Sequence, residues 1–469
     1  MYRSKKIILL LQTLALGVLF VSCSESPKQQ QPDNTSSLPD KVTFAEHIAP
    51  IIYNNCTVCH RPGESGPFNL LTYADVVKNA NKIKFVTATR FMPPWPADPG
   101  YTHFIGERTL SQQQIDLIQK WVEQGKLLGD TGKMPAVPVF YTGSSFGKPD
   151  LVIKLQKPVF LKGNGTDNFL MIKYPYQIPR DTFVRFIEFV PHQRKLVHHV
   201  NGHLVSYNEK RKFEYFKGES VLPDVQSNFK SFFEKMKLGY SDGNKDFPPM
   251  IPNTVYYLPG YVPPVYPNNI GGYLFKKNGV FLLKNIHYGP ATKDVYDSSY
   301  INVFYAKSPP VRPIRETQLG TFGISPIEPE LIIPANEVKT FHTQWTCNQD
   351  ISILSVNPHM HLLGKTFLAY ALTPQGDTIR LVKIKRWDFR WQYYYTFKLM
   401  LKIPAGSTIH VYGTFDNTNK NPFNPFSPPR TISQGQGNES MQTTEEMFQF
   451  IFTYLPYQVG DENISLERK

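Results

Sequence analysis

The feature that most constrains this chain is the run Cys56-Thr57-Val58-Cys59-His60. Two cysteines separated by two residues, with a histidine directly after the second, form the attachment signature of a c-type haem. The two thiols become thioethers to the porphyrin, and the histidine is a ligand of the iron. The motif therefore predicts one covalently bound haem c at Cys56, Cys59 and His60, and it implies an oxidising compartment outside the cytoplasm.

A second axial ligand to such an iron is usually a methionine or a histidine. Met92 lies after the haem motif in the run Phe91-Met92-Pro93-Pro94-Trp95, where the prolines stiffen the loop. We therefore predict that Met92 is the second ligand, with His103 and His47 as the alternatives.

The segment around the motif is expected to form a small helical domain over residues 41–130, followed by a linker over residues 131–148. Periodic apolar residues and a candidate N-cap, Ser111, predict three helices, at Phe44–Tyr53, at Tyr73–Val86 and from Ser111 to about Gly125. A helix before the motif and another at the end of the segment resemble the cytochrome c pattern. We therefore expect an all-α cytochrome c-like domain.

The N-terminus indicates export. A basic start precedes the apolar run Ile7–Val21, and Ser22-Cys23 follows as in a bacterial lipobox, although Phe20 departs from the usual residue. We predict a lipoprotein signal peptide over residues 1–23, lipidation of Cys23 and a flexible tether over residues 24–40. The mature protein would be anchored by lipid to the membrane at the bacterial cell envelope, in the periplasm or on the outer-membrane surface. The alternative is an uncleaved membrane anchor.

Composition limits the remaining possibilities. A chain of 469 residues can hold two to four domains, and 14% aromatic residues with 40 prolines favour strand-rich structure with many turns. The net charge of +13 predicts a basic surface, and without a long Lys/Arg block it does not indicate nucleic-acid binding. With Cys23, Cys56 and Cys59 assigned, Cys347 stands alone, so no internal disulfide is expected.

Three groups of histidines occur in the strand-rich remainder: His198-His199, His287 and His359-Met360-His361. Residues two apart on a strand share a face, so His359 and His361 can bind one metal ion while Met360 points away. His198 and His199 are adjacent, so they need a bulge or a strand end to do the same, and His287 could complete that set. Three imidazoles suit copper or zinc, and two imidazoles with a thioether suit Cu(I).

These groups and their surroundings, over residues 149 to 460, resemble the copper type II, ascorbate-dependent monooxygenases, which include the peptidylglycine- and dopamine-hydroxylating enzymes. The matching elements follow one another in the family's order. They are Asp181-Thr182-Phe183 and Val190-Pro191-His192 before the first pair, Tyr257-Leu258-Pro259-Gly260, Ile286-His287-Tyr288-Gly289, His359 to Lys365 (HMHLLGK), and Thr444-Glu445-Glu446-Met447.

The resemblance implies two tandem all-β, jelly-roll-like sandwich domains, over residues 149–322 and 323–460, each with one of two copper ions. The implied ligands of the electron-transfer copper are His198, His199 and His287. Those of the O2-binding, catalytic copper are His359, His361 and Met447, with Met441 as the alternative sulfur ligand.

Two departures from the family pattern bear on the substrate. Asn357 and Ile451 stand where the peptide-amidating members have an arginine and a tyrosine that hold the peptide carboxylate. This disfavours a glycine-extended peptide substrate.

The sequence therefore predicts an oxidoreductase, a copper-dependent monooxygenase that hydroxylates a C–H bond of an unknown small-molecule substrate with O2. Electrons from an external donor, an ascorbate-like reductant or a redox protein, would enter through the fused haem. One alternative is a copper oxidase or reductase that does not hydroxylate. Another is a surface lipoprotein that binds copper or transfers electrons without hydroxylase activity.

Overall fold

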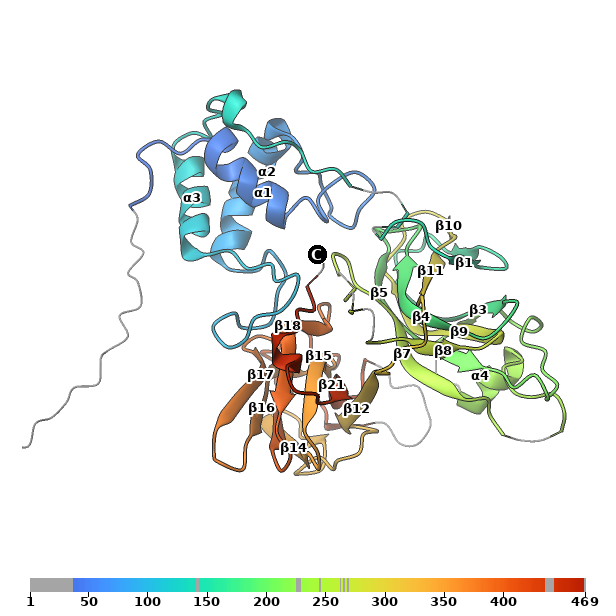
Figure 1. Cartoon of the computed structure of the whole chain (residues 1–469). Helices are drawn as coiled ribbons and strands as arrows, with labels where there is room; N and C mark the ends of the chain where they lie inside the picture. Colours follow the sequence, from blue (N-terminus) through green and yellow to red (C-terminus); the bar gives the residue numbers. More distant parts are fainter. Residues whose placement is uncertain are drawn as a thin grey trace, which may run out of the picture. The chain divides into compact units, whose positions relative to one another are not determined.

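The computed structural model describes residues 37–140, 143–144, 146–224, 229–243, 246–261, 263–264, 266–267, 270–434 and 443–467. The expected signal peptide with Cys23, the tether up to residue 36, and Met441 lie outside the described residues. The chain divides after Asp40, and Figure 1 labels the helices and strands of the unit Lys41–Lys469. Within the described ranges, no helix combines the length and the apolar character needed to cross a membrane.

The fold class expected from the sequence, an all-α cytochrome c-like domain followed by two tandem β-sandwich domains, is wrong. The structure is mostly β, with 37% strand and only 13% helix, and the helix of the described ranges lies in four short helices. Among the residues that the structure describes, an all-α cytochrome c-like domain is not seen.

Three of the helices lie in the segment that carries the haem motif. They are α1 (Ala49–Asn55), which continues the π-helical turn η1 (Phe44–Ile48), α2 (Tyr73–Ala88) and α3 (Gln112–Glu123). Capping boxes begin two of them, because Thr72 and Asp75 exchange side-chain and backbone hydrogen bonds at α2, and Ser111 and Gln114 do so at α3. Their buried faces share one core that includes Phe44, Ile52, Ile83, Ile118 and Trp121.

The connection between α2 and α3 explains why this segment is not a separate helical domain. Ala97 forms an antiparallel bridge with Ile384, and Phe104 forms one with Phe397. Both are almost completely buried, and both belong to the hydrophobic core of the last two large sheets rather than to the helical core. The connection between α2 and α3 therefore packs into the sheets formed by residues 315–456.

Residues 151–305 form two larger sheets around one core. The first has the order β1 (Leu151–Lys154), β11 (Tyr300–Tyr305), β4 (Thr182–Val190) and β8 (Tyr273–Phe275). The second has the order β6 (Val221–Pro223), β3 (Asn168–Gln177), β9 (Asn278–Tyr288), β5 (Val197–Ser206) and β7 (Met250–Tyr257). The short strands β2 (Val159–Leu161) and β10 (Val295–Asp297) pair with each other, and α4 is Phe229–Lys235. Buried residues from both larger sheets, such as Val184, Val200 and Leu283, make up the shared core.

Residues 315–456 form a second pair of larger sheets. One has the order β12 (Arg315–Gly320), β21 (Phe448–Pro456), β15 (Ile351–Met360) and β18 (Tyr395–Ile403). The other has the order β14 (Val338–Thr346), β19 (Thr408–Asp416), β16 (Gly364–Leu372) and β17 (Thr378–Ile384). The strands β13 (Ile332–Ile333) and β20 (Ile432–Ser433) form a small separate pair.

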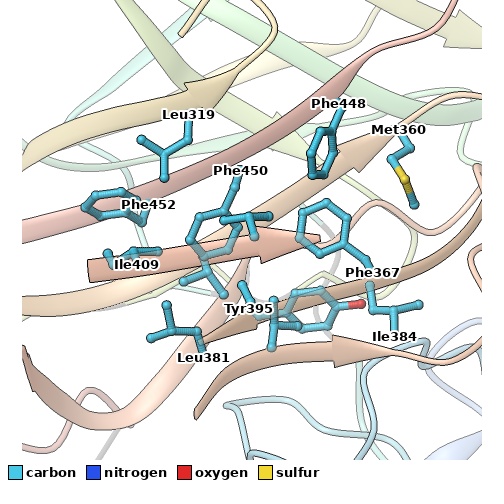
Figure 2. Close-up of a cluster of buried hydrophobic side chains, with 14 of the residues drawn as sticks. Leu319, Met360, Phe367, Leu381, Ile384, Tyr395, Ile409, Phe448, Phe450 and Phe452 are labelled. Carbon is cyan, nitrogen blue, oxygen red and sulfur yellow. The ribbon is translucent and has the colours of Figure 1, made fainter. Parts of the chain in front are cut away.

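The core of this second pair is rich in phenylalanine (Figure 2). Phe448, Phe450 and Phe452 alternate along β21 and point into it, as the period of two along a strand requires. Phe367 comes from β16 and Ile409 from β19, so both sheets supply the core.

A buried ion pair joins the connection after β11 to the end of the chain. Arg312 donates hydrogen bonds of 2.7 Å to both carboxylate oxygens of Asp461, which opens the 3-10 turn η3 (Asp461–Asn463). The hydroxyl of Ser352 donates a further bond of 2.5 Å to Asp461. Burial raises the pKa of Asp461, but the bonds from Arg312 and Ser352 lower it, and the resulting pKa is about 2.

Candidate metal centres

The first histidine set lies where β5 pairs with β9. His199 stands opposite His287 in this pairing, and the register shifts on both sides of His199. These irregularities allow two adjacent residues to reach one point, which a regular strand would not. The ring centroid of His287 is 4.6 Å from that of His198 and 5.2 Å from that of His199. The structure therefore brings together the three residues that the sequence grouped.

An aspartate not singled out from the sequence also belongs to this set. Asp167 Oδ1 accepts a hydrogen bond of 2.8 Å from Nε2 of His287. The ligand atoms of Asp167, His198 and His287 lie within 4.8 Å of one another. A carboxylate in this position can fix the orientation of a metal-binding imidazole or supply an oxygen ligand. The ring of Phe169 stacks on the ring of His287, with centroids 4.3 Å apart.

The rings of the first set are neutral at neutral pH. Burial lowers the pKa of His198, His199 and His287, and neighbouring imidazoles lower that of His198 and His199 further. The Asp167 carboxylate acts in the opposite direction on His287, whose pKa is nevertheless below its ordinary value. A neutral imidazole has a lone pair available for a metal ion.

The second histidine set lies at the end of β15. The ring centroids of His359 and His361 are 5.1 Å apart, and the rings are perpendicular. Met360 is completely buried and belongs to the hydrophobic core of the two C-terminal sheets (Figure 2). The pairing of β15 with β21 ends with Met360 opposite Phe448, and His361 and Met447 are the residues directly beyond this last pair.

A buried glutamate fixes the backbone around this second set. Glu446 accepts hydrogen bonds from the backbone N–H of His361 (2.9 Å), Leu363 (2.6 Å) and Met447 (3.3 Å). Burial raises the pKa of Glu446 to about 8, although these bonds lower it. Glu446 therefore ties the histidine segment to the methionine segment, which gives a structural reason for an acidic residue directly before Met447.

The imidazoles of the second set are held through Nδ1. The carbonyl oxygen of Glu445 lies 2.9 Å from Nδ1 of His361. The side-chain oxygen of Gln392 makes a hydrogen bond with Nδ1 of His359. Partners at Nδ1 leave Nε2 of each ring for a metal ion, and they fix the tautomer. Burial lowers the pKa of His359 to about 3, and the neighbouring His361 lowers it as well. Nothing in the sequence motifs pointed to Gln392.

The ring of Phe389 lies close to both histidine sets. The centroid of Phe389 is 6.2 Å from that of His199 and 5.7 Å from that of His361, and it is nearly perpendicular to both rings. The two sets also influence each other electrostatically, because His359 and His361 lower the pKa of His199. The two sets are therefore close neighbours, and Phe389 lies near both.

A cavity of about 390 Å³ opens beside the haem motif. One part of its wall is formed by Cys56, Cys59, His60 and Met92. His60 Nδ1 is 3.0 Å from the carbonyl oxygen of Phe68, which leaves Nε2 for an iron. The four side chains expected to hold a covalent haem thus line the same cavity.

The two alternatives to Met92 do not line this cavity. His103 is exposed and pairs with Glu107 at 3.0 Å. His47 lies near its own N-terminal turn, where its Nδ1 accepts a hydrogen bond from the backbone N–H of Thr43. Of the three candidates for the second iron ligand, the geometry favours Met92.

The residues that depart from the peptide-amidating pattern have structural roles here. Asn357 and Ile451 face each other between β15 and β21. The side-chain amide of Asn357 donates a hydrogen bond of 2.9 Å to the carbonyl oxygen of Tyr393, and both Asn357 and Ile451 are buried. This pair offers no charged group to a substrate.

No family model matches this sequence, and no curated protein matches it either.

Proposed function

We propose that this protein is a copper-dependent monooxygenase that hydroxylates a C–H bond with O2 and receives its electrons through a c-type haem attached at Cys56 and Cys59. One observation carries the proposal. Two sets of imidazoles lie close to the same phenylalanine ring, and one set lines the same cavity as the haem motif. Such an arrangement suits two redox metal ions that exchange electrons.

The donor atoms fit two copper ions of different character. His198, His199 and His287 offer three imidazoles, a set that suits copper. His359, His361 and Met447 offer two imidazoles and a thioether, and the soft sulfur favours the reduced ion. When bound, copper would supply the one-electron chemistry and the O2 binding that side chains alone cannot. In this proposal the second set is the catalytic one.

The chain's own residues contribute geometry and environment. Gln392 and the Glu445 carbonyl hold the rings of the second set in the tautomer that leaves Nε2 for the metal. Glu446 fixes the backbone on which His361 and Met447 stand. The uncharged pair Asn357 and Ile451 supports a substrate without a carboxylate near this point.

We also propose that the protein is exported and anchored to the cell envelope through a lipid on Cys23. The supports are the basic start, the apolar run and the Ser22-Cys23 junction of the sequence. An ascorbate-like reductant or a redox protein would supply electrons to the haem from outside.

The test combines metal analysis with substrate oxidation. Purified protein should contain two copper ions and one haem, and it should consume O2 with a C–H substrate from a library of aromatic, aliphatic and peptide compounds, giving an alcohol detected by mass. Met447→Ala should abolish hydroxylation and leave the haem absorption spectrum unchanged. Met250→Ala, at the exposed start of β7, is the matched control and should keep full activity.

Each outcome separates the proposal from its alternatives. A stable haem protein that binds no copper supports the electron-transfer lipoprotein. Two bound coppers with O2 consumption but no oxygenated product support an oxidase. Full activity in Met447→Ala would show that another sulfur, such as Met441, is the ligand.

A further inference from the structure

The cavity beside the haem motif is also bounded by the first histidine set. Cys56 and Cys59 lie in one part of its wall, and His198, His199 and His287 lie in another. The described residues that line it therefore include the candidate haem attachment site and the candidate electron-transfer centre together. The two candidate sites therefore face the same cavity.

The charge of the cavity wall suits a porphyrin. Four cations line it, Lys82, Arg108, Lys195 and Arg390, and no aspartate or glutamate occurs among the described residues of the wall. A haem carries two propionates, which positive side chains stabilise. Arg108 is held in place by a hydrogen bond of 2.6 Å to the carbonyl oxygen of Gly260, next to the Pro259 that also lines the cavity.

One short segment continues from this cavity to the second histidine set. Phe389, Arg390 and Trp391 line the cavity, and the next residue, Gln392, binds His359. The side-chain amide of Gln392 also donates a hydrogen bond of 2.8 Å to the carbonyl oxygen of Phe389, which closes the segment into a tight turn. The first histidine set therefore lines the cavity itself, and the segment from Phe389 to Gln392 connects the cavity wall to the second set.

From this geometry we infer that the haem attached at Cys56 and Cys59 packs against the first histidine set inside one shared cavity, and that the electron enters the copper centres there without a diffusing carrier. A haem held by Cys56, Cys59 and His60 would give one electron to a copper ion held by His198, His199 and His287, so that the haem iron would be oxidised and the copper reduced with no bond made or broken. The inference rests on the proposed function, and it adds the entry point and the direct contact.

Electron paramagnetic resonance tests the contact without turnover. Ferric haem is paramagnetic and speeds the relaxation of a cupric ion that lies close to it. Two variants each keep one copper: His359→Ala with His361→Ala retains the first set, and His198→Ala with His199→Ala retains the second set. The cupric relaxation rate should be several-fold faster in the protein that retains the first set. A Cys56→Ser, Cys59→Ser protein, which cannot attach haem, gives the reference rate for each centre.

Equal relaxation rates in the two proteins, or rates equal to the haem-free reference, would overturn the inference. A second measurement does not depend on the variants. After rapid reduction of the haem in the copper-loaded wild-type protein, its reoxidation by copper, followed by absorption, should proceed at a rate independent of protein concentration. A rate that rises in proportion to concentration would mean transfer between molecules, and it would also overturn the inference.

The two failures can be distinguished. If metal analysis finds no copper at the first set, the proposed function fails, and the inference fails with it. If copper is bound there and the protein hydroxylates substrate, but the haem does not affect the cupric relaxation, only the inference fails.

Discussion

Gly289 lies directly against the imidazole of His198, so closely that a Cβ at position 289 would stand 2.5 Å from Nε2. Real Cβ atoms do not approach other atoms so closely, so Gly289→Ala must displace the His198 ring. We expect this variant to lose copper selectively from the first histidine set and to keep copper at the second set, measured by metal analysis and by the cupric resonance spectrum. Gly239→Ala is the matched control, because its Cβ would meet nothing within 4 Å.

If Gly289→Ala binds two coppers with the affinity of the wild-type protein, His198 is not a ligand. In that case, His199, His287 and Asp167 would be the remaining donors at this point.

Gln392 holds His359 through a hydrogen bond to Nδ1. Removing the partner of a metal-binding histidine typically weakens metal affinity by ~10–100-fold. We expect Gln392→Ala to weaken copper binding at the second set by this factor, measured by titration against a competing chelator. Gln392→Glu keeps an oxygen acceptor at the same place and should retain most of the affinity. A loss of equal size in both variants would indicate a packing role for the side chain instead.

The centroid of the Phe389 ring lies 6.2 Å from that of His199 and 5.7 Å from that of His361. Phe389→Ala leaves space beside both sets, and we expect it to slow hydroxylation while both coppers stay bound. A displacement of about 1 Å in an active site can cost ~100-fold in rate, so a decrease between several-fold and that limit is expected. The measurement is the turnover rate together with copper content. Phe389→Leu fills most of the volume and should be intermediate, whereas a wild-type rate in Phe389→Ala would show that the ring has no part in coupling the sets.

The buried pair of Arg312 and Asp461 predicts acid sensitivity. The pKa of Asp461 is about 2 in the folded protein, below the value of ~3.9 for an aspartate in an unfolded chain. The unfolded state therefore binds the proton more readily, and this contribution to stability is present above pH ~4 and is lost as the pH falls towards 2. Denaturant unfolding at a series of pH values should show the free energy of unfolding decreasing through this window.

Asp461→Asn removes the titrating group. At neutral pH it should lower the free energy of unfolding by about 3–5 kcal/mol, because the buried Arg312 is left without its countercharge. The same variant should lose much of the pH dependence between pH 4 and 2. An unchanged acid transition in Asp461→Asn would assign that transition to other carboxyl groups.

The grouping of the histidines was accessible from the sequence because ligand residues occur in short, ordered patterns. The period of two along a strand places His359 and His361 on one side and Met360 on the other, and the structure shows this arrangement. The residues that support these rings were not accessible in the same way. Asp167 and Gln392 reach the histidines from far along the chain, and neither stands in a pattern of its own.

The fold class could not be obtained from local signals alone. The N-cap Ser111 was accessible from the sequence, because a capping box depends only on nearby residues. Whether the predicted helices close into an independent all-α domain depends on distant contacts. Ala97 and Phe104 instead pack into the core of the C-terminal sheets. No local sequence pattern indicates these long-range contacts.

These two contacts also order the events of folding. Ala97 and Phe104 are synthesised well before their partners on β17 and β18, which follow much later in the sequence. Contacts between residues so far apart in sequence slow folding, because a large loop must close before they form. The segment that carries the haem motif therefore reaches its final packing only after β18 has been made, which leaves an interval in which Cys56 and Cys59 are accessible from the side that Trp391 lines in the folded protein.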